Sequence, residues 1–299
     1  MELLTDVSPG DWLLERRRER AGAGGPAGAG FEAYARILHP VQAIRWDRSV
    51  TDQHGMPGLL EETRWPWARV AERQGLTMHP LVQWNRLADV HQGVVFPDGW
   101  QVGQTDEGYL DLDLLAALTE HLSATTSTPD ELVAGFWNGW AELTGAGGSR
   151  YVRHESGLRA RLAARLGQGV PIGPLVLPDP EVRAAASRGP FLRWPDVELL
   201  LFATSVGELA DPAWVERACL GVEPGARGLG PQVIWPRDHA WLVTSDIDED
   251  STIVAGPRAL LDAVLADDRL EAFEVDEDAD LASEGDRVNP PRDGWSEGP

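Results

Sequence analysis

Two apolar runs flank a cluster of acids in "WLVTSDIDEDSTIVAG", residues 241–256, and this stretch constrains the fold most strongly. Both runs are short and partly β-branched, which favours strands. The Asp and Ser side chains between them favour a turn, because they hydrogen-bond their own backbone. We therefore predict two antiparallel strands, 241–245 and 252–256, joined by an acidic connection.

Helical and strand patterns alternate along the rest of the chain. The clearest helix is 111–122, where leucine recurs at helical spacing, and the clearest buried strand is 196–206, "DVELLLFATSV". Further helices are predicted at 9–20, 66–75, 80–89, 156–167, 211–221 and 257–270, and further strands at 31–38 and 271–275. The mixture predicts an α+β fold, with a mixed or antiparallel sheet and flanking helices.

Residues 128–143, "TPDELVAGFWNGWAEL", fit two structures. Thr128 to Glu131 make a capping box, which favours a helix, whereas Gly135 and Gly139 would each cost a helix about 1 kcal/mol relative to alanine. We predict a short helical turn followed by a strand.

Segments rich in glycine, proline or acids, which interrupt helices and strands, suggest how the chain is divided into domains. We predict an N-terminal helix and glycine-rich connection over 1–30, one α+β domain over 31–275, and an acidic disordered tail over 276–299. "LTGAGGS", 143–149, is the one candidate for a boundary inside the domain. Little regular structure is expected in 21–30 or 285–299, which are rich in glycine, proline or acids.

The charge balance limits the classes of partner that the chain is expected to bind. The 299 residues include 48 acids and 26 bases, a formal net charge of −22, so we expect no nucleic-acid partner. No apolar run approaches the roughly 18 residues of a spanning helix, and "MELLTDVSPGDW" has acids where a signal peptide has bases. We therefore expect a cytoplasmic protein with no membrane partner. The single cysteine, Cys219, agrees with a reducing compartment, and its apolar neighbours predict a buried structural thiol.

All of the basic residues are arginine. Without lysine the chain cannot form a Schiff base with pyridoxal phosphate or place a P-loop lysine on a nucleotide phosphate. Arginine is no substitute as a base, because its pKa above about 12 keeps it protonated. The sequence also lacks a dinucleotide fingerprint in a strand-to-helix context, and we expect no cofactor.

The acidic connection matches two known motifs incompletely. Residues 248–252 satisfy an Asp-x-Asp-x-Thr pattern that resembles the first motif of haloacid-dehalogenase-type phosphotransferases, but too little chain follows to build the domain that motif serves. Asp246, Asp248 and Asp250 match positions 1, 3 and 5 of an EF-hand loop, but serine stands where glycine is needed and Pro257 where a bidentate glutamate is needed. The histidines show no metal-ligand spacing. We therefore predict a solvated turn without a metal site.

Tryptophan is unusually abundant, with 13 residues against 3 tyrosines and 6 phenylalanines. Most of these rings are expected in the core, because tryptophan buries a large area. Trp137 and Trp140 have glycines beside them, which would let a ring or another backbone approach closely. We predict that this pair forms a ligand- or partner-binding surface and that at least one ring is partly exposed on a concave face.

Four blocks, "GFEAYARILHP", "HPLVQW", "TPDELVAGFWNGW" and "WPRDHAWLVTSDIDEDSTIVAG", resemble the recurring blocks of a family of uncharacterised actinobacterial proteins with no assigned activity. The resemblance covers about residues 9–275. The family's last block is expected to hold a glutamate where this chain has Asp246, so an acid stands there in both. The resemblance implies a bacterial cytosolic protein and gives no catalytic residue.

Two hypotheses of function follow. The first is a non-enzymatic binding or regulatory protein that uses the surface of Trp137 and Trp140 to contact a protein or a small molecule. The second is a hydrolytic enzyme, with or without a metal, that uses Asp246, Asp248 and His239 as acid, base or ligand. Proximity of His239 to the acids would favour the enzyme, and a solvated turn without a cleft would favour the binding protein.

Overall fold

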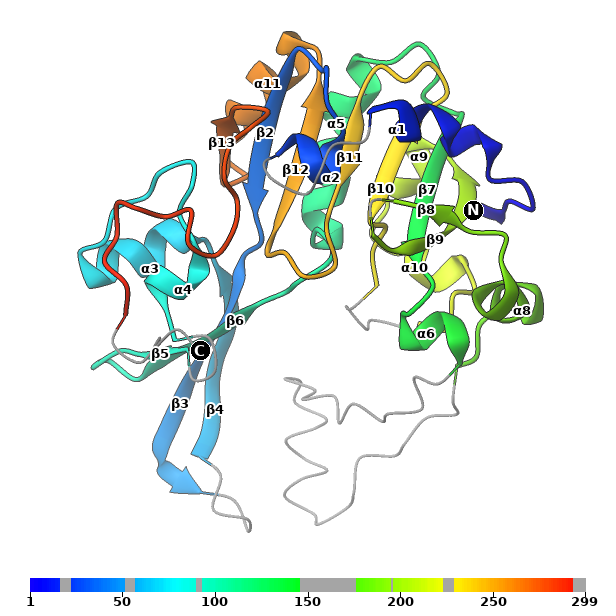
Figure 1. Ribbon diagram of the computed structural model, residues 1–299. Helices are drawn as coiled ribbons and strands as arrows, with labels where there is room; N and C mark the ends of the chain where they lie inside the picture. Colours follow the sequence, from blue (N-terminus) through cyan, green and yellow to red (C-terminus); the bar gives the residue numbers. More distant parts are fainter. Residues whose placement is uncertain are drawn as a thin grey trace, which may run out of the picture.

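The computed structural model describes residues 1–16, 23–51, 57–89, 93–145, 176–194, 196–222 and 229–292, with only the backbone of Arg48. These residues form helices and two antiparallel sheets, which confirms the α+β class and shows that the sheets are antiparallel rather than mixed. The two sheets define a large lobe and a small lobe (Figure 1).

The large lobe is built on a sheet with the strand order β1-β9-β7-β10-β11-β12-β2-β13, and β8 pairs with β9. Every neighbouring pair in it is antiparallel. The strands are β1 (Glu2–Leu3), β2 (Ala33–Leu38), β7 (Leu132–Trp137), β8 (Leu192–Arg193), β9 (Glu198–Thr204), β10 (Val233–Pro236), β11 (Leu242–Thr244), β12 (Ser251–Gly256) and β13 (Ala272–Val275).

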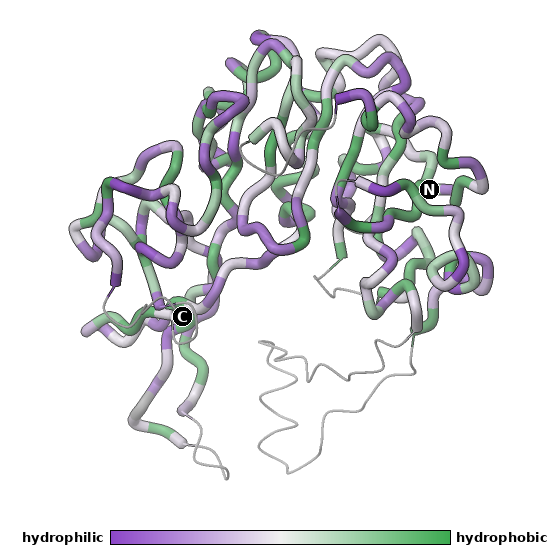
Figure 2. The backbone as a smooth tube through the Cα atoms, in the orientation of Figure 1, coloured by the Kyte–Doolittle hydropathy of each residue, from purple (hydrophilic) through white to green (hydrophobic). Residues whose placement is uncertain are grey.

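Both faces of this sheet are covered by packed side chains. Successive residues of a strand point to opposite faces, so they enter two different hydrophobic cores. On β9, Leu200 and Phe202 face one core, which also holds leucines of α5 (Leu112–Ala124) and α11 (Arg258–Leu265). Leu199 and Leu201 face the other, which holds Leu13 of α1 (Asp11–Arg16). Figure 2 shows the hydrophobic character of these strands. The other helices of the large lobe are η1 (Ser8–Gly10), α2 (Gly24–Ala27), α6 (Ala141–Thr144), α8 (Pro180–Arg188), α9 (Val206–Leu209) and α10 (Trp214–Arg217).

The small lobe comprises the described residues of 41–105 and has a separate core. Its sheet has the order β4-β3-β6-β5, formed by β3 (Val41–Thr51), β4 (Pro57–Trp65), β5 (Val94–Val95) and β6 (Trp100–Thr105). Helices α3 (Trp67–Gln74) and α4 (Trp84–Leu87) supply the aromatic side chains that pack on it. The small lobe thus lies between β2 and α5 in the sequence. Of the boundary suggested at 143–149, residues 146–149 lie outside the described residues.

Residues 276–292, which follow β13, are called the strap below. They contain no helix or strand, but the strap runs along α3 and α4 of the small lobe (Figure 1). Asp286 and Asn289 are 1% and 5% exposed and bond to the small lobe. The prediction of a disordered tail from 276 is therefore wrong for the strap, and 293–299 lie outside the described residues.

Several predicted elements need correction. The glycine-rich connection 21–30 contains α2, whose small residues fit beneath Glu277: a Cβ on Gly24 would lie 2.7 Å from the Glu277 side chain. The helix at 211–221 is only the four residues of α10, because Cys219 takes a positive φ of 52°. Cys219 is exposed, so the prediction of a buried thiol is wrong. The helix predicted at 156–167 lies outside the described residues.

Other predicted elements are confirmed. The ambiguous segment is a strand, β7, after a turn closed by the hydrogen bond from Glu131 N to Thr128 O. The strand β2 and the helices α3, α5 and α11 lie where the patterns placed them, although α4 is a four-residue part of the helix expected at 80–89. Among the described helices, none combines the length and apolar character that crossing a bilayer requires.

Candidate functional site

A cavity of about 190 Å³ lies where the small lobe meets the β11–β12 turn and the strap. Its lining is polar: four carboxylates, three amides, two hydroxyls and one indole ring. The residues are Gln83, Trp84, Asn85, Gln104, Thr105, Glu107, Asp248, Glu249, Asp250 and Ser283. Since one water occupies about 30 Å³ of liquid, the cavity has room for a small organic molecule.

The β11–β12 turn is the predicted acidic connection. Val243 pairs with Val254 in the antiparallel ladder, which confirms the hairpin. The Asp246 side chain accepts a hydrogen bond from Asp248 N at 3.2 Å, as expected of an aspartate that supports a turn. Asp248 lines the 190 Å³ cavity, whereas Asp246 lines a separate space of only about 10 Å³. Asp248 is exposed, as expected of a solvated turn, and the turn also forms one wall of a cavity, which the sequence did not predict.

A glycine lets the chain between β6 and α5 pack closely against the β11–β12 turn. Gly108, between β6 and α5, has a φ of 87°, and its N–H donates to Glu249 O at 3.0 Å. A Cβ at Gly108 would lie 3.2 Å from Ile247 O, so a larger residue would push the two segments apart. This close approach brings Glu107 and Asp248 to the same cavity, where the charge of Asp248 acts on Glu107.

The carboxylates of the cavity repel one another. Burial raises the pKa of Glu107, and the negative charges of Asp250 and Asp248 raise that pKa further. No ion pair or hydrogen bond holds the Glu107 carboxylate within the described part of the chain. Binding of a cation would relieve this repulsion.

One arginine lies behind the acidic wall. Arg36, on β2, is fully buried, and its Nη2 lies 3.5 Å from Asp250 Oδ1. Its Nη1 donates to Val82 O at 2.7 Å, and its Nε donates to Ser251 Oγ at 2.9 Å. Burial raises the pKa of the Asp250 carboxyl, and the Arg36 guanidinium opposes that shift. Arg36 therefore joins the large sheet, the acidic turn and the small lobe.

A second buried network lies beside this arginine. The His39 side chain is buried, and its Nδ1 lies 2.7 Å from Asp106 O, which can only accept. His39 is therefore the Nδ1–H tautomer, and its Nε2 accepts from Thr252 Oγ1 at 2.8 Å. Thr252 in turn accepts from Ser245 Oγ at 2.6 Å. Burial lowers the pKa of His39 to about 4, so the ring is neutral at pH 7.

The residues of the enzyme hypothesis do not come together. His239 lies in the turn between β10 and β11, at the other end of β11 from Asp246 and Asp248. Its ring stacks on Trp12, with centroids 4.2 Å apart. The set of Asp246, Asp248 and His239 therefore forms no acid–base constellation.

Trp137 and Trp140 are both partly exposed, which agrees with the exposure predicted for the pair, but neither lines the two cavities described above, and the predicted concave face stays a prediction. Their rings meet edge to face, with centroids 5.7 Å apart. Trp137 N and Trp140 Nε1 both donate to Gln232 Oε1, at 2.6 and 3.1 Å. Gly139 is needed because a Cβ there would lie 2.3 Å from the Trp137 ring. The packing of the Trp137 ring therefore explains why residue 139 is a glycine, and this glycine gives no evidence for a ligand.

The described residues contain no group of three or more His, Cys, Asp or Glu side chains arranged to hold a metal ion. A hard cation needs six or more converging oxygens, including carbonyls held by a tight turn. We therefore expect calorimetric titration of the metal-free protein with calcium, magnesium and zinc to show no submicromolar site at the β11–β12 turn. A tight site that Asp248→Asn abolishes would contradict this prediction.

The sequence indicated the acids of one wall of the cavity, but it predicted neither the cavity nor the other residues that line it. The acids of 246–250 were visible as a cluster, but Glu107 and Arg36 carry no local signal, since their role depends on what the fold places beside them. Gln83 and Asn85 were assigned only to a helix. Comparison of this chain with protein-family models, curated proteins and solved structures found no match.

Proposed function

We propose that this chain is a binding protein that holds a small organic cation in the cavity between its lobes. The observation that carries the proposal is the polar cavity, whose described lining holds four carboxylates and no arginine; Arg36 lies behind the wall and is paired with Asp250. Amide and hydroxyl groups complete the lining and suit a ligand with several N–H donors. An ammonium group would gain charge-assisted hydrogen bonds and relieve the repulsion around Glu107.

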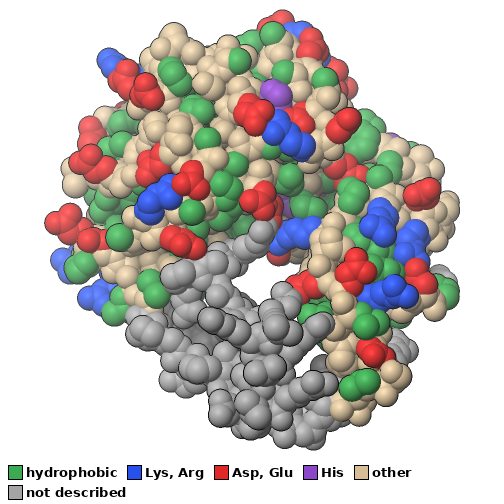
Figure 3. Space-filling model, turned by 180° about the vertical axis from the view of Figure 1, so that it is seen from behind, with side chains coloured by type: hydrophobic (Ala, Val, Ile, Leu, Met, Phe, Trp, Pro, Cys, Tyr) green, Lys and Arg blue, Asp and Glu red, His purple; other side chains and the backbone are tan. Residues whose placement is uncertain are grey.

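The charge of the whole molecule supports the same class of ligand. With a net charge of −22, the field around the protein attracts cations and repels anions. Figure 3 shows acidic side chains spread over the visible face, with arginines among them. The same field supports our proposal that nucleic acid is not a partner.

The proposal retains the binding class predicted from the sequence and moves the site. Trp137 and Trp140 are engaged with Gln232, so the argument for a ligand rests on the cavity and not on their surface. We further propose a cytoplasmic, bacterial protein of the actinobacterial family whose blocks it resembles, supported by the quoted blocks and the single cysteine.

Three four-carbon probes of different charge test the ligand class. We expect putrescine, a diamine, to bind in calorimetric titrations at pH 7 and low ionic strength, and succinate and 1,4-butanediol to bind at least about tenfold more weakly. Equal affinity for the diol would show that charge is not recognised. Binding of succinate alone would overturn the proposal.

Glu107→Gln is expected to weaken putrescine binding by about tenfold, since a hydrogen bond to a charged group contributes roughly 1.5–3 kcal/mol. The affinity of the wild-type protein should also fall as the pH drops through the raised pKa of Glu107, because the protonated carboxyl no longer attracts a cation. Glu131→Gln is the matched control, since Glu131 is exposed and bonds to Arg237 at the opposite end of the large sheet. An unchanged affinity in Glu107→Gln would place the ligand elsewhere.

A further inference from the structure

The strap forms part of the cavity wall while belonging to neither sheet. Ser283 lines the cavity, and its carbonyl accepts a hydrogen bond from Asn85 Nδ2 at 3.0 Å. Leu281 O accepts from Gln83 Nε2 at 3.2 Å. Gln83 and Asn85 also line the cavity, so the side chains that hold the strap are those that would meet a ligand.

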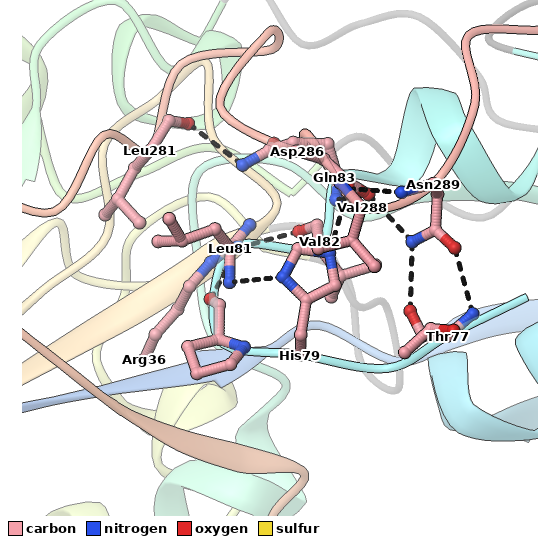
Figure 4. Close-up of polar contacts among 11 residues, drawn as sticks. Arg36, Thr77, His79, Leu81, Val82, Gln83, Leu281, Asp286, Val288 and Asn289 are labelled. Atoms are coloured by element: carbon pink, nitrogen blue, oxygen red, sulfur yellow. Dashed lines mark hydrogen bonds and ion pairs between the residues drawn. The ribbon is translucent and has the colours of Figure 1, made fainter.

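Polar contacts hold the strap to the small lobe, as Figure 4 shows. Asp286 accepts from His79 Nε2 at 2.8 Å, and the other ring nitrogen of His79 accepts from Leu81 N at 3.3 Å. Asn289 Nδ2 donates to Thr77 O, and Asn289 Oδ1 accepts from Thr77 N, both at 2.9 Å. At the C-terminal end of the strap, Arg292 Nη1 donates to Gln74 Oε1 and to Leu87 O, both at 2.7 Å.

Apolar burial contributes little to this attachment. The buried side chains of the strap, Asp286 and Asn289, are both polar, whereas Val288 is 59% exposed. Ala279 and Leu281 are only partly buried where they pack on a small apolar cluster. A segment with few buried apolar contacts opens at a lower free energy than the core of its domain.

From these observations we propose that the strap is a gate: its residues 281–292 detach from the small lobe while both sheets stay folded, and their detachment widens the opening of the cavity, at which Glu107 and Asp248 are already exposed. Detachment breaks the bonds to Gln83 and Asn85 and removes Ser283 from the wall. The role of the gate in ligand exchange rests on the proposed function, but the opening itself does not.

A thiol placed in the cavity reports the opening without any ligand. Thr105 lines the cavity from β6, so Thr105→Cys in a Cys219→Ser background gives one reporter. We expect Asn289→Ala to speed labelling of the introduced thiol by a maleimide about tenfold, because it removes several hydrogen bonds of the strap. Arg292→Ala should speed labelling about threefold. Asn138→Ala is the matched control, since Asn138 bonds to Glu198 in the large lobe, and should leave the rate unchanged.

Two results would overturn the gate. One is equal labelling in the reporter, Asn289→Ala and Arg292→Ala proteins. The other is hydrogen exchange in which the amides of 281–292 exchange as slowly as those of β3 and β6, which would mean that the strap opens only on global unfolding. Faster dissociation of putrescine from Asn289→Ala would support the gate's role in ligand exchange. If the wild-type protein binds no putrescine, the proposed ligand fails while the labelling rates still decide the gate.

Discussion

Arg36→Met is expected to lower the free energy of unfolding by about 3–5 kcal/mol, the cost of removing one partner from a buried ion pair. The substitution leaves Asp250 without its counter-charge, and it leaves the carbonyl of Val82 without its donor. Urea denaturation at pH 7, followed by tryptophan fluorescence, measures the change.

Two further variants test whether the effect of Arg36→Met comes from the buried ion pair. Arg193→Met removes an arginine that is 79% exposed from its pair with Glu198, and should cost less than about 1 kcal/mol. Combining Arg36→Met with Asp250→Leu should recover part of the lost stability, because no uncompensated buried charge then remains. A cost below about 1 kcal/mol for Arg36→Met alone would show that the guanidinium is solvated.

The second large effect concerns acid. In the unfolded chain His39 takes up a proton below about pH 6.5, whereas the folded protein keeps it neutral down to about pH 4. The unfolded state therefore binds more protons in this window, and stability falls as the pH drops from 6.5 to 4, by about 3 kcal/mol in total. Burial is the main cause of the lowered pKa; Arg36 and Arg64 lower it further, and the Asp106 carbonyl and Asp111 oppose them.

His39→Gln should remove this component of the acid sensitivity, although its stability at pH 7 is expected to be lower than that of the wild-type protein. Other titrating groups are common to both proteins, so the difference between their unfolding free energies, measured by urea denaturation at pH 6.5 and at pH 4, isolates His39. Parallel loss of stability in the two proteins would mean that His39 is protonated in the folded state at pH 4.

The large sheet was largely predictable because its strands carry their own signals. Residues 241–256 show two apolar runs around a turn, and β9 is a continuous apolar run, which fits a strand buried on both faces. The helix α5 shows leucines at helical spacing and begins after Asp111, whose side chain accepts from Asp113 N. Each of these elements is specified within about a dozen residues.

The small lobe escaped prediction although part of its pattern was present. At the start of β3, Val41 and Ala43 are buried while Gln42 between them is exposed, which is the alternation of a strand. Pro40 lies in the short link between β2 and β3, and a proline at this place indicates the end of a strand without indicating that a second strand follows at once.

The cavity and the strap could not be predicted for a different reason. His79 and Asp286 lie 207 positions apart, and their contact depends on the whole path of the chain. No local periodicity distinguishes an acid that a distant histidine holds from one in a disordered tail. The composition of the strap alone favours disorder. In the folded protein, hydrogen bonds to the small lobe hold the strap in place.

The small lobe leaves the large sheet after β2 and returns before α5, and the Nδ1–H of His39 bonds to the carbonyl of Asp106 across these two crossings. Both ends of the lobe therefore lie within one hydrogen bond of each other, the arrangement that lets a segment be inserted into a host without disturbing it. The paired residues of β2, β12 and β13 include none of 41–105. In topological terms the small lobe is an insertion between β2 and α5 of the large lobe, because the large sheet takes no strand from it.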